Sequence, residues 1–159
     1  MTDFEALLRT LAQNRVNFII IGGAAATAHG SARLIQNLEI MYDRSPENLN
    51  RLVDALAKYK PYLRGAPPGL PFRWEGATLR NGLNFTLVTS LGAIDLLGEI
   101  PGGGDYDELK SGAVELQVFS ARCLCLSLPQ LIRAKRAAGR PRDLEVLAEL
   151  EAIEDESVS

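Results

Sequence analysis

The sequence predicts an α/β protein in which short apolar strands alternate with amphipathic helices. Three observations support this. Segments with helical spacing alternate with short runs rich in β-branched residues, two pairs of such runs are joined by short turns, and two capping boxes mark helix starts. The chain has 159 residues, no repeats and no second core pattern. We therefore expect one domain over residues 1–154 and a frayed tail at 155–159.

The N-terminal third predicts the order helix, strand, helix, strand. Apolar residues at helical spacing favour a first helix that ends near Asn14; they are Phe4, Leu7, Leu8 and Leu11. The nearly all-apolar run Val16–Ile21 is typical of a central strand. Gly22-Gly23 ends it, and a compact helix closed by Gly30 follows. Residues 38–42 form the next predicted strand.

The rest of the chain is predicted from caps and turns. Ser45-Pro46-Glu47 starts a helix, with a capping serine and a proline in the first turn. Four prolines mark residues 61–82 as an irregular excursion. Residues 84–89 and 93–97 form a hairpin, and residues 114–119 and 122–126 a second strand pair. Capping boxes begin helices at Asp105 and Ser127, and a last helix follows Gly139-Arg140-Pro141.

Composition narrows the classes of function. The formal net charge is −3, which argues against a general nucleic-acid binder, although residues 133–142 carry a basic cluster without an acid. No apolar run approaches the ~20 residues that span a bilayer. The N-terminus lacks a secretion-signal pattern, so we expect a cytoplasmic protein with no membrane partner. Cys123 and Cys125 are expected to be reduced thiols on one strand.

The glycine pair Gly22-Gly23 is a candidate anion site. A strand that ends in two glycines before a helix lets a ligand approach the backbone and directs free N–H groups at it. The same pattern also serves as a tight connection without a ligand, and the residues alone leave both interpretations open. The spacing is neither a Walker nor a GxGxxG motif, which excludes those two nucleotide sites.

Polar side chains on the following strand are candidate metal ligands. Asn37, Glu39, Met41 and Asp43 share one face by strand alternation. Oxygen ligands suit Mg²⁺, although a sheet end that faces solvent explains the same pattern. Asp95 lies within an apolar run, where an acid needs a partner, a functional role or a solvent-facing position.

These residues resemble the nucleotidyltransferase superfamily, with its polymerase-β-like fold. The residues that carry the resemblance are IIGGAAATAHG, LEIMYD, AIDLLGEIPG and LIRAKRAAGRPRDLEVLAEL, which span most of the chain. The closer similarity is to small bacterial proteins related to abortive-infection and toxin–antitoxin nucleotidyltransferases. The resemblance implies an α/β (α+β) nucleotidyltransferase fold: a small mixed β-sheet flanked by helices.

The resemblance also implies an activity and roles for particular residues. The activity is Mg²⁺-dependent transfer of a nucleoside monophosphate from an NTP to an RNA, protein or small-molecule acceptor, with an antitoxin as a further partner. Gly22, Gly23 and Lys135 would bind phosphates. Asn37, Glu39 and Asp95 would hold the metal, and Asp95 and Glu39 would be catalytic. A solvated basic helix end is the alternative for Lys135.

The chain departs from the family pattern at the metal ligands. Related proteins read Thr-Arg-Asp-x-Asp where this chain reads Ile35-Gln36-Asn37-Leu38-Glu39. Asn37 supplies a neutral oxygen, and Glu39 moves its carboxylate by roughly 1 Å, an error that can cost about a hundredfold in rate. The alternative function is therefore a catalytically impaired homologue that binds a nucleotide, RNA or protein.

Two further features can be explained by local structure alone. Asp105-Tyr106-Asp107 is acid-x-acid, but its capping pattern and the lack of a preceding strand favour a helix start. His29 closes the short helix, where it can order the loop, contact a substrate or be purely structural.

Overall fold

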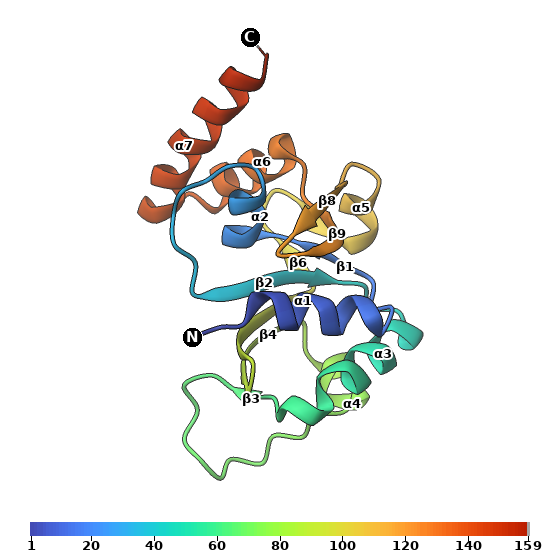
Figure 1. Cartoon of the computed structure of the whole chain (residues 1–159). Coiled ribbons are helices and arrows are strands. Elements are labelled where there is room, and N and C mark those ends of the chain that lie inside the picture. Colours follow the sequence, from blue (N-terminus) through green and yellow to red (C-terminus); the bar gives the residue numbers. More distant parts are fainter. Residues whose placement is uncertain (159) are drawn as a thin grey trace.

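The computed structural model describes residues 1–158, which form a seven-stranded mixed sheet, a small two-stranded sheet and helices on both sides (Figure 1). The strands of the large sheet are β1 (Phe18–Ile20), β2 (Asn37–Tyr42), β3 (Tyr62–Leu63), β4 (Asn84–Thr89), β5 (Gly92–Leu97), β8 (Val114–Val118) and β9 (Ala121–Cys125). The small sheet pairs β6 (Glu99–Ile100) with β7 (Gly104–Asp105). The described chain therefore has the mixed α/β architecture that the sequence predicts.

The helices occupy the connections between these strands. They are α1 (Phe4–Gln13), α2 (Gly22–Ala28), α3 (Pro46–Leu56), the 3₁₀ turn η1 (Ala57–Tyr59), α4 (Gly76–Asn81), α5 (Tyr106–Lys110), α6 (Leu128–Ala138) and α7 (Pro141–Val158). In Figure 1, α2, α6 and α7 lie in the upper part of the view, on the side of β8 and β9, whereas α3 and α4 lie in the lower part, on the side of β3 and β4. Among residues 1–158, no helix is both long and apolar enough to cross a bilayer.

The centre of the large sheet combines parallel and antiparallel pairs. The strand order is β3-β4-β5-β2-β1-β9-β8. β2 is parallel to β5 and β1 is parallel to β9, whereas the pairs β1–β2, β4–β5 and β8–β9 are antiparallel. The register of the β2–β5 pair sets Glu39 directly beside Asp95. Both side chains therefore lie on the same face of the sheet.

Local sequence signals explain most element boundaries. Asp3 caps α1 by accepting a hydrogen bond from the Ala6 N–H, and Ser45 caps α3 in the same way. The capping boxes that open α5 and α6 both form. Gly139 ends α6 with φ 65°, a left-handed conformation that glycine adopts without steric cost. Strand β1 is completely buried, as a nearly all-apolar run requires.

One region differs from the sequence prediction. The excursion at residues 61–82 holds the short strand β3 and the helix α4, because β3 pairs with the edge of β4 and α4 packs on α3. Helix α7 extends to residue 158, since its acidic stretch contains no glycine or proline, and the frayed tail at 155–159 stays a prediction. Ser159 lies outside the described residues.

A buried asparagine in α3 connects the residue before β1 to the residue after β2. Asn48 in α3 is fully buried. Its Oδ1 accepts a hydrogen bond from the Asn17 N–H at 2.6 Å, and its Nδ2 donates to the carbonyl oxygens of Asn17 (3.0 Å) and Asp43 (2.7 Å). These bonds hold the start of β1 against the end of β2, which fixes the strand that leads into Gly22.

We expect Asn48→Ala to lower the free energy of unfolding by about 3 kcal/mol, because it removes three hydrogen bonds made by a fully buried side chain and takes the partner from the Asn17 N–H and the Asp43 carbonyl. Urea denaturation followed by circular dichroism measures this. Asn50→Ala, an exposed position on the same helix, is the matched control and should change stability by less than about 0.5 kcal/mol. Equal losses in the two variants would contradict the structural role of Asn48.

Candidate nucleotide-binding site

The predicted glycine turn and metal ligands lie on the three elements α2, β2 and β5, and the predicted phosphate-binding Lys135 lies on α6. Gly22 and Gly23 form the first turn of α2, directly after β1. Asn37 and Glu39 lie on β2, and Asp95 lies beside Glu39 on β5. The structure therefore brings together the glycine turn and all three predicted metal ligands.

Gly22 and Glu39 are in close contact. Gly22 has φ +61°, and a Cβ atom added to it would lie 2.6 Å from the carboxylate carbon of Glu39. The backbone of Ile21 donates a hydrogen bond to the Glu39 carbonyl at 3.1 Å, which holds the two strands in register. The Glu39 carboxylate thus lies against the glycine turn.

The charge of Glu39 is influenced from several elements. Burial raises the pKa of Glu39 above its ordinary value; the Lys135 ammonium partly opposes this, and the neighbouring Asp95 carboxylate adds to it. Arg140 and Arg142 also lower the pKa of Glu39, by less than Lys135 does. Three members of the C-terminal basic cluster that the sequence singled out, Lys135, Arg140 and Arg142, therefore act on Glu39 through their charge.

Lys135 itself is paired with a buried acid. Its Nζ lies 3.3 Å from Oδ1 of Asp143, whose side chain is only 1% exposed. Arg140 binds the same carboxylate through Nε at 2.6 Å. Burial would raise the pKa of Asp143, but the hydrogen bonds from Arg140 and the Lys135 charge outweigh burial and lower it. Asp143, which the sequence did not single out, therefore anchors two cations at the junction of α6 and α7.

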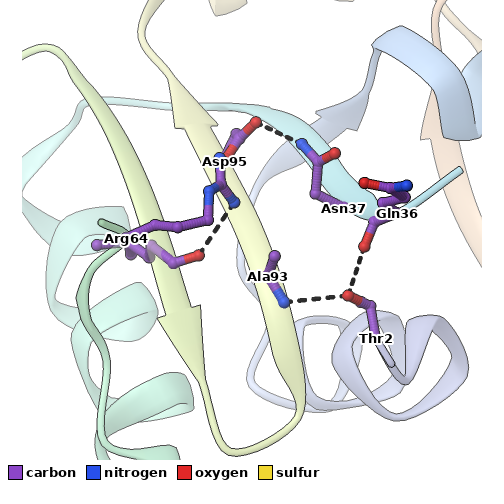
Figure 2. A network of polar contacts seen from close by, with 7 residues as sticks. Thr2, Gln36, Asn37, Arg64, Ala93 and Asp95 are labelled. Atoms are coloured by element: carbon purple, nitrogen blue, oxygen red, sulfur yellow. Dashed lines mark hydrogen bonds and ion pairs between the residues drawn. The ribbon is translucent and has the colours of Figure 1, made fainter. Parts of the chain in front are cut away.

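Both carboxylate oxygens of Asp95 are already bound. Oδ2 accepts a hydrogen bond from Nδ2 of Asn37 at 2.5 Å, and Oδ1 lies 2.5 Å from Nη2 of Arg64 (Figure 2). The Asp95 side chain is 13% exposed, whereas that of Arg64 is 36% exposed. The partner that an acid in an apolar run needs is therefore an arginine, which comes from the segment that the sequence marked as irregular.

The start of the chain supports this region from one side. The Thr2 hydroxyl donates to the Gln36 carbonyl at 2.6 Å and accepts a hydrogen bond from the Ala93 N–H at 3.1 Å (Figure 2). It thus bridges the beginnings of β2 and β5, the two strands that carry Glu39 and Asp95. Gly92 is required next to it, since a Cβ there would lie 2.4 Å from the Thr2 Cα.

This arrangement does not suit a pair of Mg²⁺ ions. Asn37 turns its NH₂ group, rather than its oxygen, toward Asp95. The Arg64 guanidinium already balances the charge of Asp95, and a dication placed there would face a fixed positive charge. Across residues 1–158, no group of three or more His, Cys, Asp and Glu side chains is placed to hold a metal ion.

Asp105 and His29, the two features that local structure can explain, both make structural contacts. Asp105 caps α5, as the capping box predicts, and it lines a surface hollow of ≈ 330 Å³ together with Asp107 and Asp43. The ring Nε2 of His29 lies 2.7 Å from the Leu126 carbonyl oxygen, which ties the end of α2 to the segment after β9. Both residues therefore have a structural explanation away from Asp95.

Comparison with known proteins places the fold. No family model matches the sequence, and no curated protein matches it. Solved structures do match. A lincosamide antibiotic adenylyltransferase, LnuA, bound to lincomycin, superposes with a TM-score of 0.61 at 16% identity over 96% of this chain and 98% of its own. A nucleotidyltransferase from Thermotoga maritima has a TM-score of 0.57 at 14% identity over 90% and 86% of the two chains.

A third solved structure is ANT(2'')-Ia in complex with adenylyl-2''-tobramycin, with a TM-score of 0.55 at 12% identity over 93% of this chain and 90% of its own. At these identities the similarity establishes the fold. This chain has the nucleotidyltransferase fold, which confirms the fold class predicted from the resemblance.

Because Gly22 lies in close contact with Glu39, adding one methyl group at position 22 is predicted to lower the stability of the fold. Gly22→Ala should lower the free energy of unfolding by about 2 kcal/mol or more, because it adds left-handed backbone strain to a collision with Glu39. Gly69→Ala is the matched control: φ there is +90°, nothing lies within 4 Å of the added Cβ, and the loss should be about 1 kcal/mol. Adding Glu39→Ala to Gly22→Ala should recover the part due to collision. If that double variant recovers nothing, the two residues are not in contact.

Because the pKa of Glu39 is raised, replacing its carboxyl group with an amide is predicted to stabilise the fold in a pH-dependent way. A carboxyl group with a raised pKa in the folded state favours folding below its unfolded pKa and loses that contribution as the pH rises through the folded value. We expect Glu39→Gln to raise the melting temperature at pH 7.5 and to raise it less at pH 4. Differential scanning calorimetry at both pH values measures this. The exposed Glu99→Gln is the control, and an equal gain at both pH values would contradict the role of burial.

Proposed function

We propose that this chain binds a nucleoside triphosphate as its Mg²⁺ complex and does not carry out two-metal nucleotidyl transfer. One observation carries the proposal: both oxygens of Asp95 are bound, by Arg64 and Asn37. Transfer by two metal ions needs free carboxylates that clamp both ions. In this proposal Mg²⁺ arrives with the nucleotide phosphates and not as an ion held by Asn37, Glu39 and Asp95.

The glycine turn and the C-terminal cations support binding of phosphates. We assign Gly22 and Gly23 to close approach of the phosphates, and Lys135 to their charge, with help from Arg140 and Arg142. These three cations already attract the Glu39 carboxylate, and the same field attracts a triphosphate. Since the Glu39 carboxylate lies against Gly22, a phosphate that approaches the turn competes with it. Binding is therefore expected to be weaker than at a turn free of an acid.

Mg²⁺-dependent transfer is the second candidate function, in which Asp95 and Glu39 would be catalytic. Their direct pairing on adjacent parallel strands favours it, because it keeps two carboxylates side by side. The similar structures of LnuA with lincomycin and of ANT(2'')-Ia with adenylyl-2''-tobramycin favour a small-molecule acceptor over RNA or protein. The antitoxin partner and the cytoplasmic location stay predictions from the sequence.

One experiment separates the two functions. The chain is incubated with Mg²⁺ and labelled NTPs, together with total RNA, a lincosamide or an aminoglycoside, beside an Asp95→Ala variant. We expect no transfer of label by either protein and a rise in the melting temperature with NTP. Transfer that disappears in Asp95→Ala would establish the enzyme instead. If the NTP shifts no melting temperature and no label is transferred, the nucleotide site itself is refuted.

The arginines whose charges act on Glu39 are predicted to be the ones that affect NTP affinity. Arg142→Gln should weaken NTP binding about two- to fivefold, because an exposed charge near the phosphates acts through screened solvent. Arg136→Gln is the control: it removes an equal charge that is paired with Glu151 at 3.1 Å. Isothermal titration at low and high salt measures both. A greater loss in Arg136→Gln than in Arg142→Gln would place the nucleotide elsewhere on the chain.

A further inference from the structure

Arg64 reaches Asp95 across an intervening strand. Its backbone N–H donates to the Thr86 carbonyl at 2.9 Å, which continues the β3–β4 pairing by one residue. From there the side chain crosses β4, where Nη1 lies 3.3 Å from the Leu87 carbonyl oxygen, and Nη2 contacts Asp95. The guanidinium is therefore fixed at two points along its path to the acid.

The strand register aligns the groups on either side of this contact. Thr86 on β4 lies beside Asp95 on β5, which in turn lies beside Glu39 on β2. Arg64, Asp95 and Glu39 therefore belong to one row across the sheet, in which a cation is followed by two acids. We call these three residues the charged row.

We infer that Arg64 is an internal cation that occupies the place of a divalent metal ion, and that Glu39 and Asp95 form a latent divalent-cation site that opens when the guanidinium is removed. The inference concerns the site of the proposed function and rests on it only for the assignment of Asp95. It does not depend on nucleotide binding, because it concerns the charged row alone.

Charge balance explains why the arginine and a metal ion exclude each other. Two adjacent carboxylates in a largely buried position attract a cation, and either a guanidinium or a hard dication satisfies that demand. Asp95 uses one oxygen for Arg64 and the other for Asn37. A metal ion at Asp95 would have to displace one of these groups. With Arg64 gone, Asp95 regains an oxygen and Glu39 stands next to it on the same face.

The position of Arg64 allows the change without loss of the fold. It lies at the start of the segment 64–75, where Gly65 has φ +81° and nothing within 4 Å of an added Cβ. This segment is held further along by Trp74, whose Nε1 donates to the Val53 carbonyl at 2.9 Å. Since the Arg64 side chain is 36% exposed, its replacement creates no buried cavity.

The test measures Mn²⁺ binding, in the absence of nucleotide, from the electron paramagnetic resonance signal of the free ion. We expect Arg64→Gln to bind Mn²⁺ about tenfold more tightly than the unchanged chain, the scale on which groups around a metal ligand alter its affinity. Arg64→Lys keeps the charge and should behave as the unchanged chain does. Arg122→Gln is the matched control, because it removes an arginine from an exposed ion pair with Glu115 on β8 and β9.

A second variant assigns the site. Asp95→Asn combined with Arg64→Gln should lose the gained affinity, and circular dichroism checks that each variant is folded. Equal Mn²⁺ affinity in the unchanged chain and Arg64→Gln would overturn the inference, whether both bind or neither does. A gain that survives Asp95→Asn would also overturn it. Failure of NTP to shift the melting temperature would refute the proposed function and leave this result unaffected.

Discussion

The site depends on the parallel pairing of β2 with β5, which sets Glu39 beside Asp95. Neighbouring strands lie about 4.8 Å apart, so two carboxylates in register repel each other across a short distance. Cationic side chains on two sides of the pair offset this repulsion. Arg64, the residue after β3, pairs with Asp95, and the charges of Lys135, Arg140 and Arg142 act on Glu39.

The two carboxylates reach different states because their partners differ. Asp95 is ion-paired directly, at 2.5 Å, and also accepts a hydrogen bond from Asn37. Glu39 has its cations at longer range, because Asp143 binds Lys135 and Arg140 first. Burial therefore dominates for Glu39 and raises its pKa. The buried Asp143 thus binds two of the cations that act on Glu39.

The architecture could be predicted from the sequence because its signals are local. The apolar run before Gly22, the caps at Ser45 and Ser127 and the turn near Gly92 each act within a few residues. The short strand β3 could not be predicted, because two residues carry no periodicity and are ordered by pairing with β4. Helix α7 extends to residue 158, because the acidic residues at its end do not break a helix.

The site could be predicted in its position but not in its pairing. Strand alternation placed Asn37 and Glu39 on one face, and the apolar neighbours of Asp95 indicated that this acid needs a partner. That the partner is Arg64 depends on the register of β3 with β4, which residues 61–82 do not reveal in sequence. An arginine directly after a tyrosine–leucine pair was the only available signal, and such a pattern has no specific meaning by itself.

The fold rests largely on buried apolar side chains that are not part of the charged row, which is why the fold alone does not report the chemistry. The strands that carry Glu39 and Asp95 are anchored by fully buried apolar neighbours, among them Leu38, Ile40 and Leu96. Those side chains lie on the face of the sheet opposite to Glu39 and Asp95. Their burial stabilises the sheet without a metal ion. The polar positions between them can therefore change without loss of the architecture. If Arg64 takes the place of a metal ion, as we infer, this change keeps the nucleotidyltransferase fold and alters only the cation that the carboxylates hold.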